Sequence, residues 1–354
     1  MILLKNMLKS MVEQEGSDLH LSIGSPPRIR INGNLKTISD NKLSSHELKN
    51  LLKDELTAER LDKLSDGYDI DFSIGITGLS RFRVNLFTQR GNLVATFRRL
   101  PYNIPSIESL NLPDVVNNLT LYKKGLILIT GGTGSGKSTT MASLIQKISH
   151  EINGHIITIE DPIEYLYEHS KSLVNQREIG SDTHSFQSSL KSVLRQDPDV
   201  VSIGELRDSE SMNAALTIAE TGHLVLGTLH TNNAAGTVTR LISAFPSGKQ
   251  DIIRTTLSMN LISIISQQLI PNLNKGRTLA LEILMNTPSI KALIRENNIH
   301  QIDNYLLSGK KDGMIKMDDS ILDLYKDKVI SKDEALNFAI NNTEMLQRIE
   351  GLTR

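Results

Sequence analysis

The chain has 354 residues, of which 39 are lysine or arginine and 40 are aspartate or glutamate, so its formal net charge is −1. This length predicts two domains, and the balanced charge, 4% aromatic residues and absence of tryptophan argue against a nucleic-acid-binding protein. The chain contains no cysteine, which excludes disulfides, thiolate catalysis and cysteine-ligated metal sites.

The N-terminus has the apolar spacing of an amphipathic helix. It carries Lys5 and Lys9 and lacks the long apolar segment of a secretory signal. No uncharged apolar run in the chain approaches the ~20 residues that cross a bilayer. We therefore expect a cytoplasmic protein with no transmembrane segment.

Residues 1–100 are predicted to form an α+β domain. Asn32-Gly33 between two runs of alternating residues is typical of a β-hairpin, because both residues tolerate positive φ. Ser44 and Glu47 have the spacing of a capping box before an expected helix over 45–64. Further strands are expected near 68–74, 79–87 and 93–98.

Three prolines within residues 101–113 interrupt the pattern, and this stretch is predicted to be an interdomain linker. Over residues 114–285, apolar strands alternate with helical segments, which is the pattern of parallel βαβ units in an α/β core. Residues 286–354 are expected to be mostly helical. The strands expected in the core are 126–130, 156–159, 200–203 and 224–229.

The segment Gly131–Ser138 has the sequence GGTGSGKS and matches the phosphate-binding loop G-x-x-x-x-G-K-[ST]. An apolar strand precedes it and a helical pattern follows, as this loop requires. Its glycines allow backbone N–H groups to surround phosphate oxygens, Lys137 supplies a cation, and the Ser138 hydroxyl is a ligand for Mg²⁺. The predicted nucleotide ligands are Gly131, Gly132, Thr133, Gly134, Ser135, Gly136, Lys137, Ser138 and Thr139.

Two acidic clusters follow predicted parallel strands, at the sheet edge where open α/β sheets bind ligands. The first contains Glu164, and the second, Asp199–Asp208, occupies the Walker B position. Gly204 stands where many such sites carry an aspartate that binds Mg²⁺. Glu205 is therefore the candidate to polarise the attacking water. The alternative for both clusters is that their acidic residues only cap strand ends and helices.

His223 and His230 flank the strand over 224–229. Their odd separation places them on opposite faces, roughly 23 Å apart at about 3.3 Å per residue, so a shared metal is not expected. His230 lies where it could sense the γ-phosphate. A structural histidine is the alternative, and it is favoured less for His230 than for His223.

Arginines are concentrated at the end of the first domain, and alternation places Arg81 and Arg83 on one strand face. The planar guanidinium group suits a triphosphate, and an arginine from a neighbouring subunit can couple hydrolysis to assembly. A solvated basic face is the alternative. The predicted arginine ligands are Arg81, Arg83 and Arg98.

Together these motifs resemble the PilT/PilU family of type IV pilus retraction motors, in the secretion-ATPase superfamily, over nearly the whole chain. Thr158–Glu164 is similar to the Asp box, Asp197–Asp208 to the atypical Walker B motif, and Ala219–Thr231 to the His box of the family. Arg81–Val84 is similar to its arginine-bearing strand and Leu293–Glu296 to its C-terminal helical motif. The C-terminal tail resembles PilU more than PilT.

The resemblance implies a PAS-like N-terminal domain joined to a RecA-like P-loop ATPase core, with a helical C-terminal region, assembled as a hexameric ring. It implies ATP and Mg²⁺ as cofactors, Glu205 as the catalytic base, Glu164 as an assisting carboxylate, and His230 and Arg207 in the same catalytic set. The implied activity is pilus retraction at the inner face of the cell membrane. The implied partners are an inner-membrane platform protein and a partner retraction ATPase, without nucleic acid.

Three other functions are considered. Pilus-assembly and type II secretion ATPases usually carry a four-cysteine module, which this cysteine-free chain lacks. A nucleic-acid-translocating ATPase is disfavoured by the neutral charge. A nucleotide-gated adaptor that assists a partner ATPase without fast turnover is the alternative from a non-enzyme class.

Overall fold

The computed structural model describes residues 3–100 and 103–352 and divides the chain into two compact units. The first unit contains Met1–Asn103 together with Asp161–Leu166, and the second contains Ile104–Glu160 and Tyr167–Arg354. The short segment Asp161–Leu166, which carries Glu164, therefore belongs to the first unit although it lies within the sequence of the second.

The first unit is a six-stranded antiparallel sheet in the order β3-β2-β1-β6-β5-β4. Its buried side chains, including Phe82 and Phe97, form a single core with the helices of the unit. The Asn32-Gly33 hairpin is confirmed, with both residues at positive φ (49° and 82°). The elements are α1 (Leu4–Glu13), β1 (Asp18–Ser22), β2 (Arg28–Ile31), β3 (Asn34–Thr37), α2 (Ser45–Leu51), α3 (Ala58–Ser65), β4 (Ile70–Ile76), β5 (Ser80–Gln89) and β6 (Asn92–Leu100).

The helix expected over 45–64 is two helices, α2 and α3. The capping box of Ser44 and Glu47 begins α2 as predicted. The second helix begins separately because the Thr57 side chain accepts a hydrogen bond from the backbone N–H of Arg60 and caps α3.

The second unit is built on a seven-stranded sheet in the order β13-β12-β7-β11-β10-β8-β9. Every neighbouring pair is parallel except β12 and β13. The strands of the core are β7 (Gly125–Thr130), β8 (His155–Glu160), β9 (Leu173–Glu178), β10 (Val200–Ile203), β11 (Leu224–Leu229), β12 (Leu261–Pro271) and β13 (Arg277–Met285). All four predicted strands are present, whereas β9, β12 and β13 were not anticipated.

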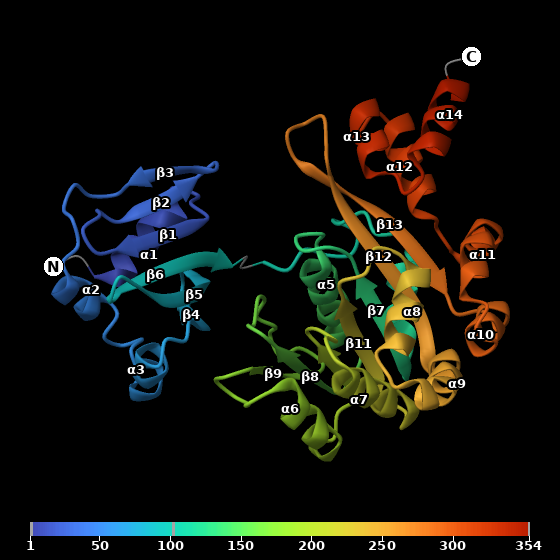
Figure 1. Cartoon of the computed structure of the whole chain (residues 1–354), viewed down its shortest axis with the longest axis horizontal. Helices are drawn as coiled ribbons and strands as arrows, with labels where there is room; N and C mark the ends of the chain where they lie inside the picture. Colours follow the sequence, from blue (N-terminus) through green and yellow to red (C-terminus); the bar gives the residue numbers. More distant parts are fainter. Residues whose placement is uncertain (1–2, 101–102, 353–354) are drawn as a thin grey trace. The chain divides into compact units, whose positions relative to one another are not determined.

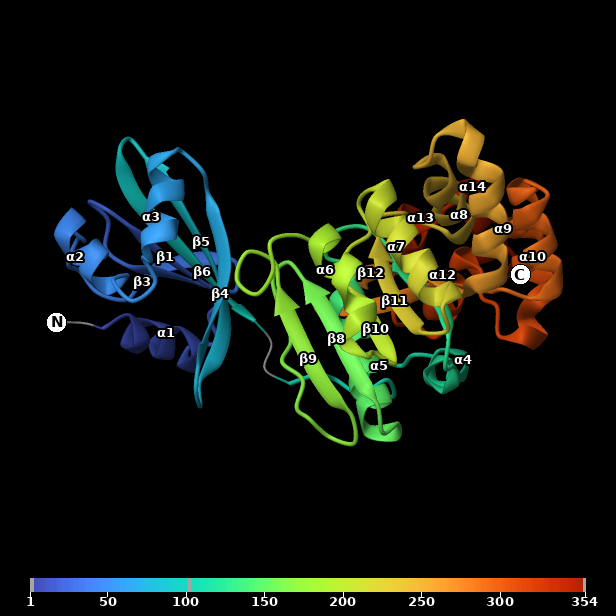
Figure 2. The ribbon, with the colours of Figure 1, turned by 90° about the horizontal axis from the view of Figure 1, so that it is seen from below.

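Helices cover both faces of this sheet, which confirms the α/β prediction. In Figure 2, α5 (Lys137–Glu151) lies on one face and α7 (Ser209–Glu220), α8 (Ala234–Ser243) and α9 (Gln250–Asn260) lie on the other. Each face has its own buried apolar cluster. Because both faces are covered, the residues of β7, β10 and β11 are buried throughout.

Most of the expected linker over 101–113 belongs to the second unit, which begins at Ile104. Residues 101 and 102 lie outside the described residues. Ile107 and Leu112 are buried in the core of the second unit, and the Ser143 hydroxyl donates a hydrogen bond to the carbonyl oxygen of Pro105. Residues 104–113 are therefore packed against the second unit, because their apolar side chains are buried in its core.

The end of the chain is helical, as predicted, and packs against the projecting ends of β12 and β13 (Figure 1). Ile270 and Ala280 from these strands share a cluster with Met317, Ile321 and the last helices. The remaining helices are α4 (Asp114–Asn118), α6 (Phe186–Val193), α10 (Pro288–Arg295), α11 (Ile302–Ser308), α12 (Met317–Lys326), α13 (Lys332–Phe338) and α14 (Asn342–Leu352).

Replacing Phe82 with alanine tests the first core. The side chain of Phe82 is fully buried, so Phe82→Ala should lower the free energy of unfolding by about 3–5 kcal/mol. Leu61→Ala is the control, because Leu61 is 48% exposed and its loss should cost less than about 0.5 kcal/mol. Urea unfolding followed by circular dichroism measures both, and equal effects would contradict the assigned core.

Candidate nucleotide-binding site

The phosphate-binding loop connects β7 to α5, as the sequence predicted. Gly131, Gly134 and Gly136 have φ values of 146°, 77° and 92°, and Gly136 is the N-cap of α5. A Cβ atom at Gly131 would overlap the carbonyl oxygen of Gln267 on β12 and lie 2.5 Å from Oγ of Ser135. The loop therefore requires glycine at Gly131 because its backbone runs directly against a neighbouring strand.

Lys137 is the first residue of α5, and its side chain folds back over the loop. Its Nζ donates hydrogen bonds to the carbonyl oxygens of Gly131 (2.8 Å) and Gly132 (2.9 Å). Oγ of Ser135 is buried and has no hydrogen-bond partner among the described residues. The loop thus gathers a cation, an unsatisfied hydroxyl and the positive end of a 15-residue helix, which together suit an anionic ligand.

The sheet order brings the other predicted residues to the edge that carries the loop. Strands β7, β11 and β10 are adjacent and parallel, so the residues after their C-terminal ends share one edge. Glu205 follows β10 and His230 follows β11. Nε2 of His230 lies 3.5 Å from Oε1 of Glu205, and Nε of Arg207 lies 2.7 Å from Oε2. Three of the four predicted catalytic residues are therefore in contact.

Gly204 explains the unusual Walker B sequence. A Cβ atom at this position would lie 3.2 Å from the carbonyl oxygen of Ile159 and 3.4 Å from Cα of Glu160, on the adjacent strand β8. An aspartate would have to displace this backbone. The carbonyl group of Gly204 accepts a hydrogen bond from the Thr228 hydroxyl on β11, which fixes the strand end immediately before Glu205.

Asp208 and His223 both contact helix α7. Asp208 caps α7 by accepting a hydrogen bond from the backbone N–H of Ser211 (2.8 Å), so the capping alternative is correct for this residue. Nδ1 of His223 lies 3.1 Å from the carbonyl oxygen of Ile218. His223 therefore lies beside the end of α7, away from the Glu205 contacts.

Glu164 and the predicted arginines belong to the first unit. Glu164 and Arg81 line a pocket of about 300 Å³, and Arg81 donates a hydrogen bond to the Ser73 hydroxyl. Nε of Arg83 lies 3.4 Å from Oδ1 of Asp71.

Arg98 has the most buried partner. Its Nε lies 2.9 Å from Oδ1 of Asp18, whose side chain is 7% exposed. Burial alone would raise the pKa of Asp18, but hydrogen bonds from Arg98 and Ser17 outweigh it and hold that pKa below its ordinary value.

Two residues near the loop were missed by the sequence analysis. The carbonyl group of Gln267 faces Gly131, and its side-chain amide donates a hydrogen bond to the Thr140 hydroxyl (2.9 Å). Ser266 accepts a hydrogen bond from Thr130 at the end of β7 (2.8 Å). The signal was a polar pair, Ser266-Gln267, following a mostly apolar run.

This loop, on a mostly parallel sheet with a glutamate at the neighbouring strand ends, defines a P-loop protein of the RecA-like class. The model of the type II/IV secretion system protein family matches residues 1–310. The chain belongs to this family and, within it, to the PilT/PilU group of type IV pilus ATPases.

Three relatives support that assignment. The chain is 39% identical to the type IV pilus ATPase PilU of Pseudomonas aeruginosa, over 95% of this chain and 88% of that protein. It is 41% identical to the type IV pilus retraction ATPase PilT of the same organism, over 93% of this chain and 96% of that protein. A crystal structure of the pilus retraction motor PilT with bound ADP matches with a TM-score of 0.91 and 44% identity, over 97% of this chain and 99% of that one. The family resemblance and the fold class are thereby confirmed.

No helix within residues 3–100 and 103–352 is long and apolar enough to cross a membrane.

Two glycine variants test the loop. Gly131→Ala should destabilise the second unit and abolish nucleotide binding, because its Cβ overlaps the Gln267 carbonyl group. Gly132→Ala is the matched control, since a Cβ there has no neighbour within 4 Å, and its thermal midpoint should stay within about 2 °C of the wild type. Differential scanning fluorimetry with and without ADP measures both, and equal midpoints would contradict the close approach.

Proposed function

We propose that this chain hydrolyses ATP with Mg²⁺ and that the hydrolysis drives retraction of a type IV pilus. The observation that carries the proposal is the carboxylate of Glu205, held between Arg207 and His230 at the sheet edge that also carries the phosphate-binding loop. The likeness to proteins named as pilus retraction ATPases supplies the process.

Each residue has a role in this proposal. Lys137 exchanges the carbonyl oxygens of its own loop for phosphate oxygens, and Ser138 holds Mg²⁺ together with the phosphates. Oxygen donors of this kind suit Mg²⁺, which supplies charge neutralisation on the phosphates when bound. Glu205 orients the attacking water and accepts its proton. Oε2 of Glu205 is paired with Arg207 at 2.7 Å, whereas Oε1 lies 3.5 Å from His230. We therefore assign Oε1 as the oxygen that faces the attacking water.

In this proposal the arginines of the first unit complete the nucleotide site of a neighbouring copy of the chain. Arg83 and Asp71 are both about 40% exposed, so their pair contributes little and can exchange partners. Arg98 is tied to the buried carboxylate of Asp18 and exchanges at a larger cost. We therefore assign Arg83 as the arginine that exchanges most readily for a nucleotide. Arg81 and Arg98 are further nucleotide ligands in this proposal, and Glu164 is an assisting carboxylate.

The proposed assembly is a hexameric ring at the inner face of the cell membrane, acting on a platform protein of the pilus base. In this proposal hydrolysis is coupled to work on that partner by a conformational change of the assembled ring. A partner retraction ATPase completes the proposed set. A nucleotide-gated adaptor of a partner ATPase is the alternative function. Pilus retraction by a Lys137→Ala variant in the presence of that partner would favour the adaptor.

Replacing Glu205 with glutamine tests the catalytic assignment. Glu205→Gln keeps the shape of the side chain and removes the base, so kcat should fall by about 10²- to 10⁴-fold while ATP still binds. Glu210→Gln is the control, because Glu210 is an exposed glutamate on α7. Phosphate release and binding of a fluorescent ATP analogue give the two readouts, and unchanged turnover in Glu205→Gln would refute the role.

The assembly is tested by dilution. If an arginine from a neighbouring copy completes the site, the ATPase rate per chain should rise with protein concentration as rings form. Native mass spectrometry with and without a non-hydrolysable ATP analogue gives the oligomeric state at each concentration. A monomer that turns over as fast as the assembled protein would contradict the shared site.

A further inference from the structure

A buried carboxylate outside the nucleotide site joins two helix N-termini. Glu282 on β13 is 2% exposed. Its Oε1 accepts a hydrogen bond from the backbone N–H of Ala234, the first residue of α8 (2.8 Å), and its Oε2 accepts one from Met317, the first residue of α12 (3.5 Å). A carboxylate suits this position because both helix ends present unsatisfied N–H groups and positive dipoles.

The first of these helices continues directly from the nucleotide site. Ala234 lies four residues after His230, which contacts Glu205. Between them, Asn233 caps α8 by accepting a hydrogen bond from the backbone N–H of Gly236 (2.8 Å). Asn232 and Asn233 line a pocket of about 480 Å³ that also includes residues 132–135 of the phosphate-binding loop.

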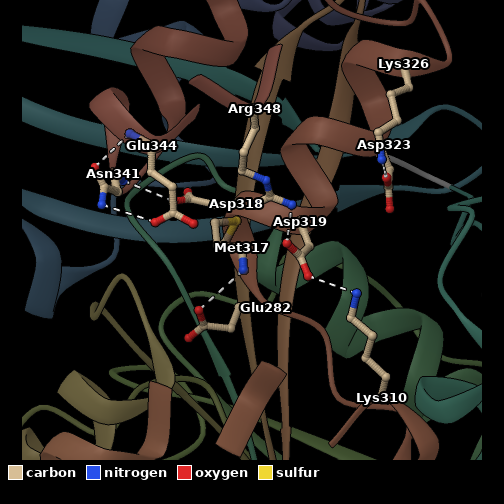
Figure 3. Close-up of polar contacts among 10 residues, drawn as sticks. All are labelled: Glu282, Lys310, Met317, Asp318, Asp319, Asp323, Lys326, Asn341, Glu344 and Arg348. Atoms are coloured by element: carbon tan, nitrogen blue, oxygen red, sulfur yellow. Dashed lines mark hydrogen bonds and ion pairs between the residues drawn. The ribbon is translucent and has the colours of Figure 1, made fainter. Parts of the chain in front are cut away.

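The second helix, α12, is bonded to a segment near the end of the chain. Asp318, the residue after Met317, is also 2% exposed, and its two carboxylate oxygens accept hydrogen bonds from the backbone N–H groups of Ile340 (2.7 Å) and Asn341 (3.0 Å). Figure 3 shows Glu282 beneath Met317, with Asp318 turned toward Asn341. Residues 338–340 line the same pocket of about 480 Å³ as the phosphate-binding loop.

These contacts form a closed path that starts and ends at the nucleotide site. It runs from the loop after β11 through Glu282 to α12, and from Asp318 to the segment 338–341, whose residues 338–340 share a pocket with the phosphate-binding loop. We propose that Glu282 and Asp318 are positioning residues for ATP hydrolysis, which make the placement of the His230 loop depend on the C-terminal helices. The inference rests on the proposed ATPase function and deepens it.

The charge state of Glu282 should give turnover a pH dependence that a purely structural role of this residue would not produce. Burial raises the pKa of Glu282 to about 7; Asp303 on α11 and Asp318 on α12 add to the rise, while the N–H donors of α8 and α12 oppose it. Below about pH 7 the protonated oxygen no longer accepts its hydrogen bond. Turnover that depends on both bonds should therefore rise as pH increases through this value.

The test compares Glu282→Gln with the wild type in the full chain, with Glu210→Gln as an exposed control. At pH 8, kcat of Glu282→Gln should fall about tenfold, which is the size of a lost charge-assisted hydrogen bond, with KM for ATP changed less than about twofold. The ratio of kcat at pH 8 to kcat at pH 6 should also be smaller in Glu282→Gln than in the wild type.

Hydrogen exchange tests the path without turnover. ADP should slow amide exchange at residues 231–237 and at 338–341 in the wild type, and in Glu282→Gln it should slow only the first segment. Unchanged kcat, an unchanged pH ratio, or retained protection at 338–341 would overturn the proposal.

If Glu282→Gln does not fold, the same exchange comparison in Asp318→Asn decides, with the same two outcomes. If the wild type does not hydrolyse ATP, the proposed function fails separately, because exchange with ADP still reports on the path.

Discussion

The close approach of β7 to β12 is the constraint on which the nucleotide site depends. Two buried parallel strands lie so near at Gly131 that only hydrogen fits between the loop and the Gln267 carbonyl group. The same neighbour donates to Thr140 in the first turn of α5, so one strand holds both sides of the loop. The phosphate-binding loop is therefore a product of sheet packing as much as of its own glycines.

The same kind of constraint acts two strands away. Because β8 approaches Gly204 closely, an acidic side chain at this position, directly after β10, would press against the backbone of Ile159 and Glu160. The carboxylate appears one residue later, at Glu205, where the chain has left the sheet. Here it gains Arg207 and His230 as neighbours. A glycine and a glutamate in this order shift the charge from the sheet to its edge, where a water molecule can reach it.

Sequence reasoning identified the parts of this site that depend on local order. Glycines and lysine at fixed spacing, and residues placed directly after strands, follow from motif and periodicity, and so the neighbourhood of Glu205 and His230 could be predicted. The role of Gln267 could not, because it requires knowing that β12 lies beside β7, more than 100 residues away. The packing of residues 104–113 could not be predicted for a similar reason, since Ile107 and Leu112 are buried by a core that no local pattern reveals.

The attachment of the C-terminal helices to β13 could also not be predicted from local patterns, and it has a physical basis in two buried carboxylates. Glu282 and Asp318 each span two backbone N–H groups, and a buried carboxylate is costly unless such donors surround it. Glu282 still retains a pKa of about 7, so its two donors do not fully offset burial. An apolar residue would avoid this cost but would leave the two helix ends unsatisfied. The carboxylate is thus the group that lets β13 hold the start of α8, which follows the nucleotide site, and the start of α12 at the same time.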